Sequence, residues 1–108
     1  SKAKHDWTAA EIAFRQATVL KPDFHQAWSE LGHALKREQR FDDSIRAYQT
    51  ALDLKPDYAP ALEYLGEAYA ALGKKADAEA QLAKLRPLDA KLADELAAFI
   101  AKGGKGSW

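Results

Sequence analysis

Leu-Lys-Pro-Asp at residues 20–23, followed by Phe24, returns 34 positions later as Leu-Lys-Pro-Asp at residues 54–57, followed by Tyr58. Further pairs at the same shift are Ala27 and Ala61, Leu31-Gly32 and Leu65-Gly66, and Ala34 and Ala68. A period of about 20 to 50 residues indicates structural units that each bury an apolar face against a neighbour. The chain is therefore expected to be built from repeats.

The composition favours helices throughout the chain. Of 108 residues, 23 are Ala and 13 are Leu, both strong helix formers, and only seven are the β-branched residues that a sheet needs. The prolines lie at or near segment ends, at Pro22, Pro56, Pro60 and Pro87. We therefore expect an all-α fold of six helices, at about residues 7–20, 24–37, 41–54, 58–71, 75–86 and 89–102.

One motif spans a full period of the repeat. Its residues are Trp28-x2-Leu31-Gly32-x2-Leu35, then Ser44-x3-Tyr48, Ala51 and Pro56. The motif resembles the tetratricopeptide repeat, whose signature is W-x2-L-G-x2-Y, then A-x3-F and a Pro. A second copy holds Leu62-x2-Leu65-Gly66-x2-Tyr69 and Ala78-x3-Leu82, and half a copy holds Ala10, Phe14, Ala17 and Pro22. The resemblance implies a right-handed superhelical α-solenoid of antiparallel helix pairs.

The expected organisation is a single repeat domain over residues 1–102. Its parts are 6–22 (second helix of a partial repeat), 23–56 and 57–88 (repeats), 89–102 (a capping helix) and 103–108 (a flexible tail). Trp108 is then either a loose end or an anchor for something else.

Several residues carry expectations about local structure. Asp23, Asp57 and Asp89 are placed to cap the helices that follow them. Gly73 is suited to end a helix in the left-handed conformation, whereas Gln39 at the equivalent position predicts a slightly irregular turn. Gly32 and Gly66 indicate close approach of two helix backbones, and Pro60 fits the first turn of its helix.

The resemblance implies that the first helices of successive pairs line a concave groove that binds segments of other proteins. The expected groove residues are Gln26, Ser29, Glu30, His33, Lys36, Arg37, Glu63, Tyr64 and Glu67. Tyr64 is the foremost single candidate, because aromatic residues often dominate interfaces. Glu63 and Glu67 favour cationic groups, and Lys36 and Arg37 favour anionic ones, which predicts a partner of mixed charge. The alternative for each residue is an ordinary solvated helix face.

The first predicted helix lacks the partner helix that would complete its pair. Its apolar residues Trp7, Ile12, Phe14 and Val19 are therefore candidates for an exposed patch. Two explanations stay open: the chain is a fragment of a longer repeat protein, or the patch docks a partner or a second copy of the chain. A self-assembling scaffold is thus the alternative to a groove-binding module.

Other functional classes receive little support. His33 and Glu67 are repeat equivalents that could meet, but no metal-binding, phosphate-binding or nucleophile motif accompanies them, so we expect no catalytic residue, metal or cofactor. Helical repeats can bind RNA, but a net charge of zero and glutamates in the groove oppose it. No membrane span or targeting segment is expected, so a soluble protein of either cytoplasm or periplasm fits.

Overall fold

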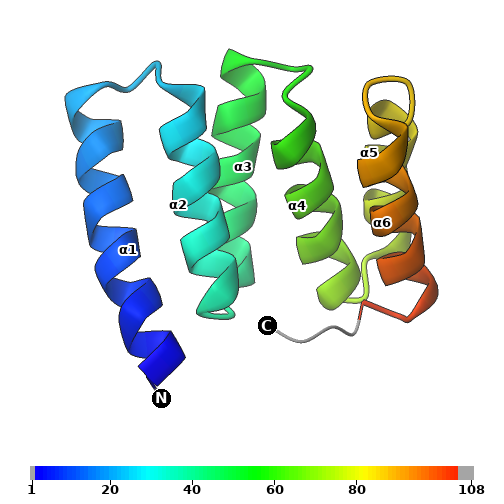
Figure 1. Ribbon diagram of the computed structural model, residues 1–108, viewed down its shortest axis with the longest axis horizontal. Coiled ribbons are helices and arrows are strands. Elements are labelled where there is room, and N and C mark those ends of the chain that lie inside the picture. The colour runs from blue at the N-terminus through cyan, green and yellow to red at the C-terminus, as the bar shows by residue number, and fades with distance from the viewer. Residues whose placement is uncertain (1, 105–108) are drawn as a thin grey trace. The chain divides into compact units, whose positions relative to one another are not determined.

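The structure is a computed structural model, and it describes the backbone of residues 2–104 and the side chains of residues 7–104. The described part contains six helices and no strand (Figure 1): α1 (Lys2–Leu20), α2 (His25–Arg37), α3 (Phe41–Leu54), α4 (Ala59–Ala71), α5 (Lys75–Leu85) and α6 (Ala90–Ala101). The predicted all-α fold is confirmed. Helix α1 begins earlier than predicted, and every other predicted end lies within one residue of the observed end.

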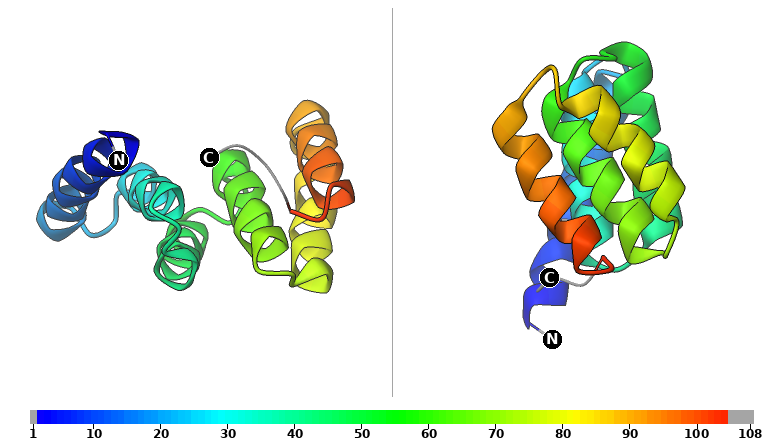
Figure 2. Two further views of the ribbon diagram at one scale, coloured as in Figure 1. Left: turned by 90° about the horizontal axis from the view of Figure 1, so that it is seen from below. Right: turned by 90° about the vertical axis from the view of Figure 1, so that its right-hand side faces the viewer.

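The chain folds as two compact units, Ser1–Pro56 and Asp57–Trp108. The division falls where the sequence predicts one repeat to end and the next to begin. In the first unit α2 packs against both α1 and α3, and the end-on view shows it flanked by them (Figure 2). Its core contains Leu31, Leu35 and Ala47, against which Phe14 and Trp28 pack.

In the second unit the three helices pack against one another. Helix α4 contacts α5 and α6, and α5 also contacts α6. The turn that ends α6 contains Gly103 and Gly104, both with positive φ, and a Cβ at Gly104 would lie 2.2 Å from the backbone oxygen of Ala70. Gly104 therefore packs against the end of α4, whereas a Cβ at Gly103 would have nothing within 4 Å. The rest of the expected tail, including Trp108, lies outside the described residues.

The helix N-termini follow one prediction and contradict two. Asp89 is the N-cap of α6, and its Oδ1 accepts a hydrogen bond of 3.0 Å from the backbone nitrogen of Leu92. The N-cap positions of α2 and α4 are instead held by Phe24 and Tyr58, without a side-chain capping bond. The predicted capping by the preceding aspartates is therefore wrong, because each helix begins one residue too late for it.

The turns after α2 and α4 are alike, which contradicts the irregular turn predicted at Gln39. Gln39 has φ of 64°, and Gly73 has φ of 78°. The backbone nitrogens of Gln39 and the next residue donate to α2 at 2.8 and 2.9 Å, and the equivalent bonds after α4 measure 3.0 and 2.8 Å. Gln39 therefore adopts the left-handed conformation and preserves the turn, at a conformational cost to a residue with a Cβ.

The glycines inside α2 and α4 make room for side chains rather than for helix backbones. A Cβ on Gly32 would lie 2.8 Å from Cδ1 of Tyr48, and one on Gly66 would lie 2.6 Å from Cδ2 of Leu96. The close approach was predicted correctly, but the group that approaches is an aromatic ring in one unit and a leucine in the other. Pro60 lies in the first turn of α4, as predicted.

Candidate functional site

The six residues predicted on α2 differ in exposure. Gln26 and Glu30 are exposed, His33 and Arg37 are half-buried, and Ser29 and Lys36 are buried. Lys36 retains only 2% of its surface, so its charge is not displayed on the helix. The surface that α2 offers is therefore made by Gln26 and Glu30, with His33 and Arg37 partly accessible beside them.

Trp7 of α1 joins this surface. Its ring meets the His33 ring edge-on, with centroids 5.2 Å apart, and the Arg37 guanidinium lies 5.3 Å from the Trp7 ring centroid. Burial lowers the pKa of His33 to about 4, and the charges of Lys36 and Arg37 act in the same direction. His33 is therefore a neutral ring at neutral pH, so the positive charge in this cluster comes from arginine.

The three residues predicted on α4 are all less exposed than Gln26 and Glu30 of α2. Tyr64 and Glu67 are half-buried, and Glu63 is buried with 7% of its surface accessible. The predicted pair of His33 and Glu67 draws one residue from each unit and stays a prediction. Within the residues described, no three His, Asp or Glu side chains form a group able to hold a metal ion. No described helix is long and apolar enough to cross a membrane.

The residues predicted for self-association fall into two groups. Phe14 packs into the core of the first unit and Trp7 lies against His33, so neither lies on an open face. Ile12 and Val19 are 55% and 74% exposed, and Leu20 beside them is 86% exposed. A shallow hollow of about 440 Å³ lies along this face of α1, lined also by Arg15 and Gln16.

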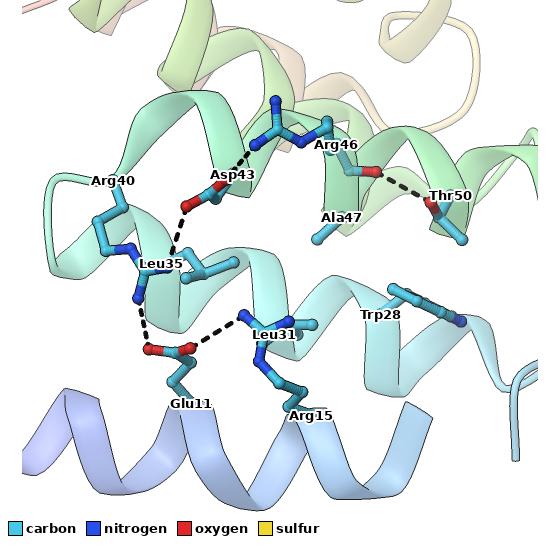
Figure 3. Close-up of a pocket in the computed structure, with 10 residues that line it drawn as sticks. All are labelled: Glu11, Arg15, Trp28, Leu31, Leu35, Arg40, Asp43, Arg46, Ala47 and Thr50. Atoms are coloured by element: carbon cyan, nitrogen blue, oxygen red, sulfur yellow. Dashed lines mark hydrogen bonds and ion pairs between the residues drawn. The ribbon is translucent and has the colours of Figure 1, made fainter. Parts of the chain in front are cut away.

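The sequence analysis did not identify a cleft in the first unit, which we call the charged cleft (Figure 3). It has a volume of about 570 Å³ and is lined by residues of α1, α2 and α3 together with Arg40. The lining residues are Glu11, Arg15, Trp28, Leu31, Leu35, Arg40, Asp43, Arg46, Ala47 and Thr50. Aliphatic and aromatic groups of α2 and Ala47 form its floor, and charged side chains from α1, α3 and Arg40 stand around it.

The charged side chains of the cleft form one continuous chain of ion pairs. Glu11 accepts from Arg15 Nη2 at 2.9 Å through Oε2, and from Arg40 Nη1 at 2.7 Å through Oε1. Asp43 accepts from Arg40 Nη2 at 3.0 Å through Oδ2, and from Arg46 Nη2 through Oδ1. The order is thus Arg15, Glu11, Arg40, Asp43, Arg46, with an arginine at each end.

The protonation states follow from this geometry. Burial by itself raises the pKa of Glu11, but the side-chain hydrogen bonds with Arg15 and Glu38 and the charge of Arg40 outweigh it, and the net result is a lowered pKa. The hydrogen bond from Arg40 lowers the pKa of Asp43, with the charge of Arg46 acting alike. Both carboxyl groups are therefore ionised at neutral pH. The lining of the cleft holds three arginines and two carboxylates, and the carboxylate of Glu38 lies just outside it, 3.8 Å from Arg40 Nη1.

The ion pairs within one helix could have been predicted from the sequence, but the link between them could not. The spacing of Glu11 and Arg15 (i, i+4) and of Asp43 and Arg46 (i, i+3) predicts a pair on one face of each helix. That the two pairs meet through Arg40 depends on α1 and α3 flanking the same helix. Only the packed structure shows that.

Comparison with known proteins agrees with the fold. A family model described as tetratricopeptide repeat matches residues 29–93. The Hsp70-Hsp90 organizing protein of Triticum aestivum is 34% identical over 76 residues, which are 70% of this chain and 13% of that protein. The peroxisomal targeting signal receptor of Eremothecium gossypii is 34% identical over 59 residues, 55% of this chain and 10% of that protein. The chain thus spans a small part of these relatives.

A solved structure gives the same result for the fold. The TPR2B domain of yeast Sti1, solved as a complex with pHsp70, matches with a TM-score of 0.83 at 24% identity, over 93% of this chain and 84% of that chain. At this identity the likeness shows the fold alone. Together with the family model, which matches more than half of the chain, it establishes that the chain belongs to the tetratricopeptide repeat family.

Proposed function

We propose that the chain is a non-catalytic protein-interaction module that binds a segment of another protein through residues of α2 and α4. The observation that carries the proposal is the solvent-facing surface of α2, where Gln26 and Glu30 lie exposed and His33 and Arg37 are partly accessible. Polar side chains of this kind give directional hydrogen bonds and leave the helix soluble when the site is empty. On α4, which belongs to the second unit, the half-buried Tyr64 and Glu67 are the proposed contacts.

The names of the relatives support the same class of function. One is an organizing protein for Hsp70 and Hsp90, another is a receptor for a targeting signal, and the matched solved domain was in complex with pHsp70. Each of these names describes a protein that recognises another protein or a signal. A segment of another protein is therefore the partner we propose for this chain.

Burial refines the expected charge of that partner. Lys36 and Glu63 are buried, so the accessible charges are Glu30 and Arg37 on α2 and Glu67 on α4. Two carboxylates and one guanidinium still favour a segment of mixed charge.

The test is to screen capped ten-residue peptides of mixed charge and to map the binders on the protein by ¹⁵N NMR. We expect amide shifts on the exposed side of α2 and at Tyr64 and Glu67. Glu30→Lys is expected to weaken the selected peptides about tenfold, whereas Glu79→Lys, an equal charge change at an exposed position of α5, leaves them unchanged. Shifts confined to α5 and α6, or equal loss in both variants, would contradict the proposal.

A second candidate function, self-association, is favoured by the exposed apolar face of α1. Val19 and Leu20 are the most exposed large apolar side chains among the residues described. If copies of the chain meet there, light scattering will show a mass that rises with concentration above 11.9 kDa. Val19→Glu should then restore the monomer mass, and Leu88→Glu, at another exposed leucine, should not. A constant monomer mass up to about millimolar concentration would rule this function out.

A further inference from the structure

The charged cleft has features that the packing of the repeat does not explain. Arg15 and Arg46, at the two ends of the ion-pair chain, keep 52% and 70% of their side-chain surface exposed. Ion pairs between exposed side chains contribute about 0–1 kcal/mol each to stability. Arg46 is therefore a weak stabiliser, whereas Arg15 and Arg40 also pair with Glu11, whose side chain keeps only 12% of its surface exposed.

The internal repeat separates what packing requires from what it does not. At the shift of 34 the apolar floor persists in type, since Trp28 becomes Leu62 and Leu31 becomes Leu65. Three of the five charges disappear, because Glu11, Arg15 and Arg46 become Ile45, Gln49 and Ala80, whereas Arg40 and Asp43 recur as Lys74 and Asp77. The part of the floor that α2 supplies thus recurs in both repeats, whereas Glu11, Arg15 and Arg46 are particular to this cleft.

The hydrogen bonds show which sign of charge the cleft is ready to accept. All four carboxylate oxygens of Glu11 and Asp43 already accept a guanidinium hydrogen, two of them from Arg40. A guanidinium has five N–H donors, and Arg15 and Arg46 each donate to a single carboxylate. The N–H groups of Arg15 and Arg46 that make none of these bonds lie at the two ends of the series of ion pairs. The cleft is therefore better suited to bind an anion than a cation.

The apolar floor of the cleft indicates which kind of group would bind next to that anion. The Trp28 indole nitrogen donates to the backbone oxygen of Pro22 at 2.7 Å, so its polar group is satisfied and its ring is held in place beside Leu31. Figure 3 shows Leu31 on α2 next to the Arg15 side chain, and the Trp28 ring farther along α2, beyond the charged side chains. A volume of about 570 Å³ accommodates a side chain with its neighbouring peptide units rather than a folded surface.

We propose that the charged cleft binds a short acidic segment of a partner protein, with one apolar side chain on the floor and the flanking carboxylates on Arg15 and Arg46. Bidentate contact between guanidinium and carboxylate suits these arginines, because both have donors to spare. The site shares no residue with the surface proposed above on α2 and α4. Failure of one proposal therefore leaves the other standing.

The test uses the capped peptide Gly-Glu-Leu-Glu-Gly titrated into the ¹⁵N-labelled chain. We expect saturable shifts at the Trp28 indole and at the amides of Ala47 and Thr50, with a dissociation constant below about 1 mM. Gly-Lys-Leu-Lys-Gly should not bind, because it meets three arginines, and Gly-Glu-Ser-Glu-Gly should bind at least about tenfold more weakly for want of the apolar contact.

Variants locate the binding. The double substitution Arg15→Gln and Arg46→Gln should weaken the acidic peptide at least about tenfold, since charged hydrogen bonds are lost at both ends. Arg86→Gln is the matched control, because Arg86 is equally exposed (51%) but lies on the second unit. Should the double variant fail to fold by circular dichroism, the shift map of the unaltered chain still decides the question.

Several results would overturn the proposal. These are no saturable binding at millimolar peptide, equal binding of the lysine peptide, equal loss in Arg86→Gln, and shifts located away from the cleft. Displacement of the peptide by inorganic phosphate or by a short oligonucleotide at lower concentration would also overturn it, by assigning the arginines to phosphate instead. Glu30→Lys is expected to leave this binding unchanged.

Discussion

Replacing Gln39 by Gly should stabilise the chain. Gln39 has φ of 64° in a turn whose hydrogen bonds match those at Gly73. A left-handed backbone costs a residue with a Cβ about 1–2 kcal/mol. Glycine avoids this cost but loses about 0.5–1 kcal/mol more through its freedom in the unfolded chain, which leaves a net gain of about 0.5–1 kcal/mol. For a domain of this size the midpoint of thermal unfolding should rise by about 3–6 °C.

Thermal and urea unfolding followed by circular dichroism measure this gain, and two matched variants isolate its cause. Gln39→Ala keeps the Cβ and removes the rest of the side chain, so it should leave the free energy of unfolding nearly unchanged. Gly73→Gln makes the reverse exchange at the equivalent turn. Because a Cβ there would have nothing within 4 Å, this variant should destabilise the folded chain by a similar amount through backbone strain alone. If Gln39→Gly is no more stable than Gln39→Ala, then left-handed strain is not stored at this turn.

Two further outcomes are expected. Gly32→Ala should destabilise by about 0.5–2 kcal/mol in urea unfolding, because the added methyl overlaps the Tyr48 ring, and the loss should largely vanish in a Tyr48→Leu background; additive losses would contradict the contact. The pKa of His33 is lowered to about 4, so between about pH 6.5 and 4 the unfolded chain binds the proton more tightly and stability falls as the pH falls. After allowance for solvent screening, the free energy of unfolding of the His33→Gln variant should decrease by about 1–2 kcal/mol less over this pH range than that of the unaltered chain. Equal pH profiles for the two proteins would refute this prediction.

The fold was predictable because its signals are local in the sequence. A repeat of 34 residues, the positions of the prolines and the scarcity of β-branched residues place all six helices. The cap predictions at Asp23 and Asp57 failed because an error of one residue in a helix start moves the capping position. The prediction of an irregular turn at Gln39 failed for a different reason. Two backbone hydrogen bonds hold this residue in the left-handed conformation, which a residue with a Cβ disfavours.

The candidate sites were less predictable, because exposure depends on what covers a helix. Periodicity places Ser29 and Lys36 beside the buried stripe of α2, but it cannot tell that both are buried. Likewise, the helical period places Trp7 and Phe14 on a different side of α1 from Ile12 and Val19, but only packing against α2 shows which side is covered. The charged cleft depends on three helices at once, so no single stretch of sequence could predict it.

The internal repeat offers a way to weigh these surfaces against each other. Some positions that recur at the shift of 34 have packing roles in the structure: Gly32 and Gly66 both lie under a large side chain, one from Tyr48 and the other from Leu96. A residue that lines a cleft without recurring cannot be explained by a requirement common to both units. Arg15 and Arg46 meet that condition, and both side chains stay at least half exposed. What distinguishes the first unit chemically is therefore its capacity to receive an anion next to an apolar floor.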